Sequence, residues 1–282
     1  MISKEFSFHA PKSLNDAFGL LERHGDDAKV LAGGMSLMPV MTLGLLQPEV
    51  VISLNHVPGL DYVREDGDKL RIGALTRHHT VLNDPLIKKH CPVLSEAAAL
   101  IGDVQVRHRG TIGGSLAHAD PAADYIPVML VTNAQFKLQS SKGERTVKAT
   151  DFFKDLMQTA LKAGELLTEI EIPKAPAGSG SAYVRLHRVE GNFAIVAAAA
   201  VIDSGFKSAR VAIGGVGPKA VLMDVSKRLA KGVNDEALRG VSDDAYAASG
   251  EAYGDLNGDA TYRRAMARVY AQRAVRAAAS RM

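Results

Sequence analysis

Two glycine pairs, each of which follows a short apolar segment, constrain this chain most. The first lies in 32–36 (Ala-Gly-Gly-Met-Ser), directly after an apolar strand predicted at 29–32. The second lies in 111–115 (Thr-Ile-Gly-Gly-Ser), about eighty residues later. Consecutive glycines let backbone N–H groups approach an anion, because no Cβ stands in the way. Successive N–H groups in such a turn form an anion-binding concavity, so both segments are candidate phosphate loops.

A single glycine pair is more often only a tight turn, but two of one design suit a ligand with two phosphates, such as a dinucleotide pyrophosphate. Neither segment matches Gly-x-Gly-x-x-Gly, which disfavours a Rossmann site. Neither ends in the Gly-Lys-Ser/Thr of a P-loop. The pattern therefore predicts a dinucleotide site of another type.

Polar residues surround the second glycine pair, with His118, Asp120 and Asp124 after it and a basic stretch at 107–109 before it. A carboxylate just past the loop can accept hydrogen bonds from ribose hydroxyls, and Asp120 can also cap the turn before Pro121. A metal site is the weaker interpretation, because no ligand cluster elsewhere completes a shell.

The order of predicted elements favours an α+β fold over a doubly wound sheet. A helix is predicted over 13–24 with Ser13 as its N-cap, and strands at 50–54, 69–73, 135–139 and 167–173. The stretch 175–181 is rich in Pro, Gly, Ser and Ala, which is typical of a linker. We therefore expect a domain over 1–176, with subdomains of about 1–56 and 57–176, and a second domain over 177–282.

Composition excludes several classes of protein. The 282 residues carry a net charge of +3 and one cysteine, Cys91, expected to be a buried small hydrophobe. One cysteine cannot form a disulfide framework or hold an iron–sulfur cluster, and a reducing cytoplasmic setting fits. The longest apolar run, 193–202, is too short to span a bilayer. No nucleic-acid partner is expected, since the arginines of a predicted amphipathic helix at 259–280 are read as a solvated face. Its predicted apolar stripe is Tyr262, Met266, Val269, Tyr270 and Val275.

At the glycine loops the sequence resembles a known family. Ala-Gly-Gly-x-Ser-Leu-x-Pro from position 32, and Thr-Ile-Gly-Gly-Ser-Leu-Ala-His-Ala-Asp-Pro-Ala-Ala-Asp from position 111, are similar to the FAD-binding medium subunit of the xanthine dehydrogenase and carbon monoxide dehydrogenase family. The likeness continues through 167–173, through Tyr183-x-Arg185-x-x-Arg188, and into the basic C-terminal helix. It implies an FAD-binding region of two α+β subdomains, of the vanillyl-alcohol oxidase and MurB (PCMH) type, followed by a small flavoprotein C-terminal α/β domain.

The resemblance also implies roles for individual residues. The two loops would hold the pyrophosphate, Asp124 the ribityl or ribose part, and Arg188 and Phe193 would approach the isoalloxazine. The full set of expected FAD contacts is Leu31, Ala32, Gly33, Gly34, Met35, Ser36, Thr111, Gly113, Gly114, Ser115, Ala119, Asp120, Asp124, Arg188 and Phe193. The chain departs from the family at Arg185, often Lys, and at Asn192-Phe193, often Asp-Tyr. Phe for Tyr keeps a stacking face and loses a hydroxyl.

The resemblance implies an electron-transfer role without an acid–base catalytic residue or a metal on this chain. Family members oxidise the substrate at a molybdopterin centre on a large subunit, and electrons cross [2Fe–2S] clusters on a small subunit to FAD and then to an external acceptor. A dimer of heterotrimers is the implied assembly. Two alternatives stay open at this point: a stand-alone flavoprotein oxidoreductase of the same fold, and a non-enzymatic nucleotide-binding or assembly module.

Overall fold

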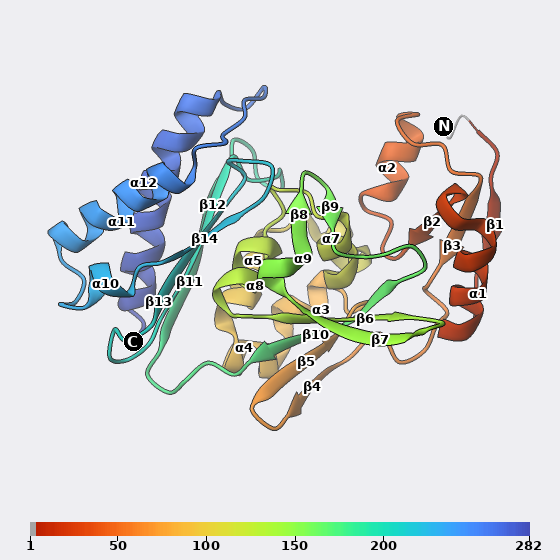
Figure 1. The fold of residues 1–282 in the computed structure, drawn as a ribbon, viewed down its shortest axis with the longest axis horizontal. Helices are drawn as coiled ribbons and strands as arrows, with labels where there is room; N and C mark the ends of the chain where they lie inside the picture. The colour runs from red at the N-terminus through yellow and green to blue at the C-terminus, as the bar shows by residue number, and fades with distance from the viewer. Residues whose placement is uncertain (1–3) are drawn as a thin grey trace.

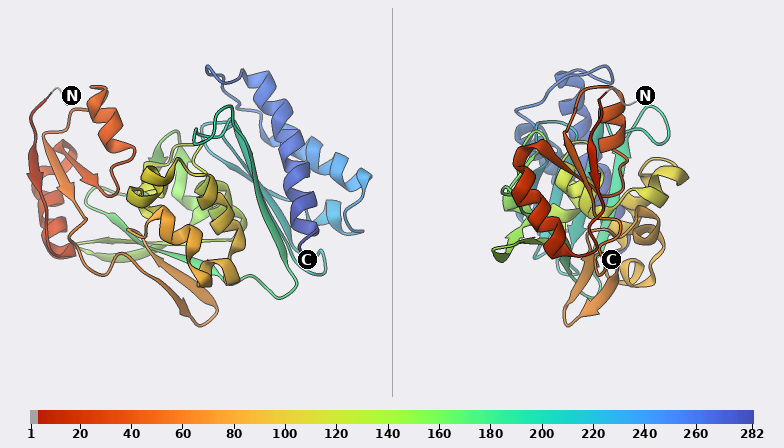
Figure 2. Two further views of the ribbon diagram at one scale, coloured as in Figure 1. Left: turned by 180° about the vertical axis from the view of Figure 1, so that it is seen from behind. Right: turned by 90° about the vertical axis from the view of Figure 1, so that its right-hand side faces the viewer.

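The computed structural model describes residues 4–282, which form three groups of elements that follow one another along the long axis of the molecule (Figures 1 and 2). The first group is built on a parallel three-stranded sheet of order β1-β3-β2. Ser13 Oγ accepts a hydrogen bond from the Asp16 N–H, and Gly25 ends the helix, so the helix predicted over 13–24 is confirmed. Its elements are β1 (Ser7–His9), α1 (Leu14–His24), the 3-10 turn η1 (Gly25–Asp27), β2 (Ala28–Leu31), α2 (Leu37–Thr42) and β3 (Val50–Ser53).

The second group is an antiparallel sheet of order β4-β5-β10-β6-β7 that packs on a layer of helices. The predicted strands at 69–73, 135–139 and 167–173 are confirmed. Its elements are β4 (Val63–Asp66), β5 (Lys69–Gly73), α3 (His78–Asn83), α4 (Pro85–His90), α5 (Pro92–Leu100), α6 (Val104–Arg109), α7 (Ile112–His118), α8 (Tyr125–Val131), β6 (Gln135–Ser140), β7 (Gly143–Lys148), α9 (Ala149–Phe152), β8 (Phe153–Asp155), β9 (Gln158–Thr159) and β10 (Leu166–Pro173).

The third group is an antiparallel meander whose strands follow chain order. One face of this sheet packs on α12, and the other contacts α5 and α8 of the second group. Four consecutive alanines, 197–200, lie buried in β12. Their small side chains allow helices to approach both faces closely, which suits an aromatic-poor core. The elements are β11 (Gly180–Leu186), β12 (Val196–Ile202), β13 (Ala209–Gly214), β14 (Val221–Asp224), α10 (Ser226–Leu229), α11 (Asp235–Ala248) and α12 (Ala260–Ala279).

The structure corrects two expectations about the C-terminal region. Tyr262 is 41% exposed, so the predicted apolar stripe of α12 is wrong at its first residue. The buried face of α12 is mostly alanine and includes the side chain of Arg263, so the prediction of a solvated arginine face is wrong at this residue. Helix α11 is absent from the elements predicted from sequence, although its buried residues Ala237, Leu238, Val241 and Ala245 follow helical spacing; two of the four are alanines, which mark an apolar face only weakly.

The predicted α+β class is confirmed, because antiparallel sheets with helices on their faces make up the second and third groups, while the parallel sheet is confined to the first. Cys91 is 3% exposed, and burial raises the pKa of its thiol to about 12. The prediction that Cys91 is a buried small hydrophobe is therefore confirmed.

Candidate functional site

The first glycine loop joins β2 to α2, and its backbone N–H groups are left without hydrogen-bond partners in the described chain. Gly34 has a φ of +79°, which is the left-handed region that favours glycine. Among residues 4–282, no acceptor is found for the N–H groups of 33–36. Four successive N–H groups without an internal partner need an external one, such as an anion or water.

The two glycine loops lie directly against each other. A Cβ added at Gly33 would stand 2.6 Å from Cα of Gly110, and closer still to the carbonyl oxygen of Arg109. A Cβ added at Gly114 would lie 3.3 Å from the Cβ of Ala32. Glycine is therefore required at position 33 for the loops to approach each other, whereas at Gly114 the tightest contact of an added Cβ would be with Thr111 Oγ1 of the same loop, at 2.7 Å.

A side-chain bridge that sequence reasoning missed fixes this arrangement. Arg77 Nη1 donates to the carbonyl oxygen of Arg109 at 2.5 Å, and Arg77 Nη2 donates to Asn55 Oδ1 at 2.9 Å. Asn55 Nδ2 in turn donates to the carbonyl oxygen of Ala32 at 3.0 Å. The two residues follow strands β5 and β3, and no local motif marks them, so only the fold brings them to the loops.

The second loop differs from the expectation that it repeats the first. Thr111 is the N-cap of α7, and its Oγ1 accepts a hydrogen bond from the Gly114 N–H at 3.1 Å. The Gly113 N–H donates to Ala74 O at 2.8 Å, and the Ser115 N–H donates to Thr111 O at 3.0 Å. These N–H groups are therefore already used within the described chain and do not form a second nest of free amides. The expected pyrophosphate contacts of Thr111, Gly113, Gly114 and Ser115 stay a prediction.

Asp124, predicted to contact a ribose or ribityl group, is buried and bound by two residues of β11. Its Oδ1 accepts hydrogen bonds from the Tyr183 hydroxyl at 2.5 Å and from Arg185 Nη1 at 2.9 Å. Burial raises the pKa of Asp124, and the bonds from Arg185 and Tyr183 oppose that rise. Within the described chain, Arg185 Nε and Nη2 are buried and have no partner. These orphaned donors mark the place as prepared for a further acceptor.

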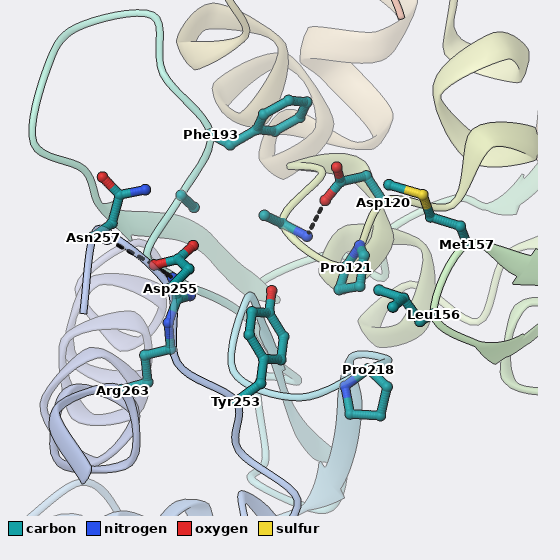
Figure 3. Close-up of a pocket in the computed structure, with 12 residues that line it drawn as sticks. Asp120, Pro121, Leu156, Met157, Phe193, Pro218, Tyr253, Asp255, Asn257 and Arg263 are labelled. Atoms are coloured by element: carbon teal, nitrogen blue, oxygen red, sulfur yellow. Dashed lines mark hydrogen bonds and ion pairs between the residues drawn. The ribbon is translucent and has the colours of Figure 1, made fainter. Parts of the chain in front are cut away.

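Two other predicted residues, Asp120 and Phe193, line one pocket of about 570 Å³ between the second and third groups (Figure 3). Tyr253 and Asp255 enter the same pocket from the loop before α12. Arg188 lies outside the lining, where its Nη1 donates to Leu256 O at 3.4 Å.

The predicted residues thus fall in neighbouring but distinct places. The fold brings the segment Leu31–Ser36 together with the second loop, and it brings Asp120 together with Phe193. Ala119, the left-handed C-cap of α7 with a φ of +54°, connects the second loop to Asp120. Met35 is 38% exposed, so its side chain points away from the core.

Comparison with known proteins fits this geometry. Residues 4–175 match the model of the FAD binding domain in molybdopterin dehydrogenase, and residues 181–278 match the CO dehydrogenase flavoprotein C-terminal domain. The chain belongs to this flavoprotein family. The carbon monoxide dehydrogenase medium chain of Hydrogenophaga pseudoflava is 40% identical to this chain, and the alignment covers 100% of this chain and 99% of the relative. The nicotine 6-hydroxylase medium subunit of Paenarthrobacter nicotinovorans is 36% identical, with 97% of each chain covered.

Solved structures of family members agree with the fold. Carbon monoxide dehydrogenase from Hydrogenophaga pseudoflava superposes with a TM-score of 0.95 at 41% identity, over 100% of this chain and 99% of that one. Quinoline 2-oxidoreductase from Pseudomonas putida 86 superposes with a TM-score of 0.89 at 32% identity, over 99% of both chains. The expected family and its FAD-binding domain are thereby confirmed.

The residues present fit an FAD molecule. Free N–H groups at 33–36 suit the charge of a pyrophosphate, and Arg185 offers buried donors beside Asp124. Among residues 4–282, no three His, Cys, Asp or Glu side chains gather so as to hold a metal ion. Within the same residues, no helix has the length and apolar character needed to cross a membrane.

Proposed function

We propose that this chain is the FAD-carrying electron-transfer subunit of a heterotrimeric molybdenum hydroxylase. It would take electrons from the [2Fe–2S] clusters of a partner subunit and pass them to an external acceptor. The observation that carries the proposal is the run of unpartnered N–H groups at 33–36, packed against a second glycine loop in a chain of this flavoprotein family.

Each part of the chain would have a separate task in holding FAD. The N–H groups of 33–36 would bind the pyrophosphate, and the hydroxyl of Ser115 lies one turn into the adjoining helix α7. Asp124 would accept hydrogen bonds from the ribityl or ribose hydroxyls, and Arg185 would donate hydrogen bonds to them. FAD supplies two-electron redox chemistry when it is bound, while the protein supplies position and electrostatics.

Partner subunits would carry the other redox centres. The single cysteine of this chain cannot hold a cluster, and the relatives named above are medium chains or medium subunits. We therefore propose a large molybdopterin subunit and a small [2Fe–2S] subunit as partners, in a dimer of heterotrimers in the cytoplasm. We keep the domain division at residue 176, with subdomains of about 1–56 and 57–176, because each range contains one of the main sheets.

The test is the visible spectrum and FAD content of the purified chain and of its co-expressed complex. We expect flavin bands with close to one FAD per chain in the complex. Gly34→Val should abolish them, because the side chain would be forced into a left-handed conformation and against Leu31 and Met38. Gly232→Val is the matched control, since Gly232 has a φ of +87° and a Cβ added there would meet nothing within 4 Å. Absence of flavin from both the wild-type chain and its complex would refute the proposal.

A further inference from the structure

A second pocket, of about 290 Å³, lies between the second and third groups, at the end of β12 away from the pocket of Figure 3. Strand β12 has seven residues, so its two ends lie about 20 Å apart. The linker between β10 and β11 crosses from one group to the other on this side (Figure 1), and we call the space the linker pocket. Ligand sites usually measure roughly 300–1,000 Å³, so this pocket suits a small molecule and is too small for a dinucleotide.

The walls of the linker pocket come from both groups. The start of α5, the end of α8 and the linker face the edge of the β11–β13 sheet across it. Two hydrogen bonds hold the linker in place, since the Lys174 N–H donates to Asp68 O at 2.9 Å and the Ala175 N–H donates to His90 O at 3.1 Å. A ligand here would therefore contact both groups. The larger apolar side chains of the lining are Cys91, Pro92, Val93, Pro173, Pro176 and Val201.

Two lining residues of opposite charge have unused polar atoms. Asp203 Oδ1 and Arg210 Nε are buried, and neither has a hydrogen-bond partner within the described chain. Val201 is paired with Arg210 in the antiparallel register of β12 and β13, and the pairing continues where the Asp203 N–H donates to Ser208 O at 2.9 Å. Alternation along the strand therefore places Asp203 and Arg210 on one face as diagonal neighbours, with Cα atoms roughly 7–8 Å apart.

Neither charge is neutralised by a neighbouring side chain. Within residues 4–282, Arg210 and Asp203 form no ion pair, either with each other or with a third residue. Asp224 faces Arg210 across β13 and β14, but its Oδ1 accepts hydrogen bonds from the N–H and the hydroxyl of Ser226. Burial lowers the pKa of Arg210, and the attraction of Asp224 opposes this shift only in part. The guanidinium is thus held in a desolvated place without a counter-ion.

The other charged groups of the lining are already engaged. Lys174 Nζ pairs with Glu65 Oε2 at 3.2 Å, and His90 Nε2 contacts Oε1 of the same carboxylate. Asp203 and Arg210 therefore present one unused negative and one unused positive charge, with a gap between them. A ligand with a single charge would leave the other group buried and unpaired, which is unfavourable. A molecule that carries both charges would pair with both groups.

We propose that the linker pocket binds a free α-amino acid with a branched apolar side chain. Its carboxylate would accept hydrogen bonds from Arg210, its ammonium group would donate to Asp203, and its side chain would pack on Val93 and Val201. Because the walls come from both groups, the bound amino acid would hold the second and third groups together. The inference does not depend on the proposed electron-transfer role, since no expected FAD contact lines this pocket.

Isothermal titration calorimetry of the full-length chain tests the inference with L-leucine as the probe. Two analogues each lack one of its charged groups: 3-methylbutylamine has no carboxylate, and 4-methylpentanoate has no ammonium. Arg210→Gln and Asp203→Asn each remove one charge from the pocket. Lys207→Gln is the control, because Lys207 is exposed in the turn between β12 and β13 and does not line the pocket. FAD content and melting temperature are recorded for every variant.

We expect L-leucine to bind the wild type and Lys207→Gln equally well, and to raise the melting temperature as its concentration rises. Each analogue should bind the wild type at least about tenfold more weakly than L-leucine. Arg210→Gln and Asp203→Asn should each lower the affinity for L-leucine by at least about tenfold. Asp203→Asn should not lower the affinity for 4-methylpentanoate, because this analogue has no ammonium group to pair with the carboxylate.

No binding of L-leucine to the wild type would overturn the inference. Equal affinity for L-leucine and 4-methylpentanoate would also overturn it, because the pocket would then recognise only a carboxylate. Wild-type affinity for L-leucine in both pocket variants would have the same meaning. The comparison of the analogues uses the wild-type chain alone, so it decides the question even if a variant does not fold. Lack of FAD in the chain and its complex would instead refute the proposed function.

Discussion

The two glycine loops share a sequence design and lie against each other, yet their backbone N–H groups have different partners. The N–H groups of 33–36 have no acceptor within the described chain, whereas those of 113–115 bind Ala74 and Thr111. Gly33 and Gly34 come just after the end of strand β2, where the chain turns away from the sheet. Gly113 and Gly114 form the first turn of α7, where a threonine N-cap takes the donor that a ligand would otherwise find.

The comparison shows that a glycine pair can serve binding or packing. In the first loop, glycine supplies a left-handed turn and a free backbone. In the second, glycine supplies close approach, since a Cβ at Gly113 would stand 2.6 Å from the carbonyl oxygen of Ala74. Substitutions should therefore distinguish the roles of the two loops. A substitution in the first loop should change the affinity for FAD, and a substitution in the second should change the stability of the fold.

The largest effect on stability is expected from Gly113→Ala. The added methyl group would press on the backbone of Ala74, and overpacking of this kind costs about 1–3 kcal/mol. The melting temperature of the FAD-free chain should fall by roughly 2–4 °C for each kcal/mol. Calorimetry of Gly113→Ala beside Gly19→Ala measures the difference, because Gly19 also lies in a helix and a Cβ added there would meet nothing within 4 Å. An unchanged melting temperature would show that the second loop is not packed as described.

The stability of the fold around His78, behind the second loop, should also depend on pH. The backbone N–H of His78 donates to Gly110 O, its ring contacts the Tyr125 hydroxyl at 3.0 Å, and burial lowers its pKa to about 4. The unfolded chain binds this proton near pH 6.5, and the folded chain does not until about pH 4. Stability from this residue is therefore lost as pH falls from about 6.5 to 4, by about 2 kcal/mol at pH 5.

Urea unfolding of the wild type and of His78→Gln at pH 7 and pH 5 isolates this contribution. The loss of stability between the two pH values should be smaller in the variant by about 2 kcal/mol. An equal loss in both proteins would mean that His78 is protonated in the folded chain.

A smaller effect is expected from Thr111→Val, which keeps the shape of the N-cap residue and removes its acceptor. Loss of the bond to the Gly114 N–H should cost about 1 kcal/mol of stability. FAD affinity, measured by fluorescence quenching during titration, should stay within about twofold, because no free N–H group of the first loop is altered. A larger loss of affinity would assign Thr111 a direct contact with FAD.

Much of the scaffold follows from local patterns. Ser13 and Gly25 bound the first helix, and the alternating strand at 69–73 lies as predicted. Of the linker predicted at 175–181, residues 175–179 lie between β10 and β11, while the last two already belong to β11. Local patterns predict the site less well than the scaffold. The bridge from Arg77 to Asn55 joins residues 22 positions apart, and the partners of Asp124 lie about sixty positions away. Contacts of this kind depend on the fold and leave no local spacing.

Arg263 is a second case in which the local sequence pattern does not predict the environment of a residue. Charged residues on a terminal helix are usually solvated, and Arg268 on the same helix follows that rule, since its side chain is 46% exposed and pairs with Asp243. Three backbone carbonyls and the carboxylate of Asp255 meet at one point, and together they make a buried guanidinium favourable at position 263.

Hydrogen exchange of the chain with and without FAD, followed by mass spectrometry on peptides from both loops, tests the central claim most directly. We expect FAD to slow exchange strongly at 33–36 and to leave 113–115 nearly unchanged, because only the first loop has N–H groups to give. Bound FAD, verified by its absorption, with no added protection at 33–36 would contradict the account.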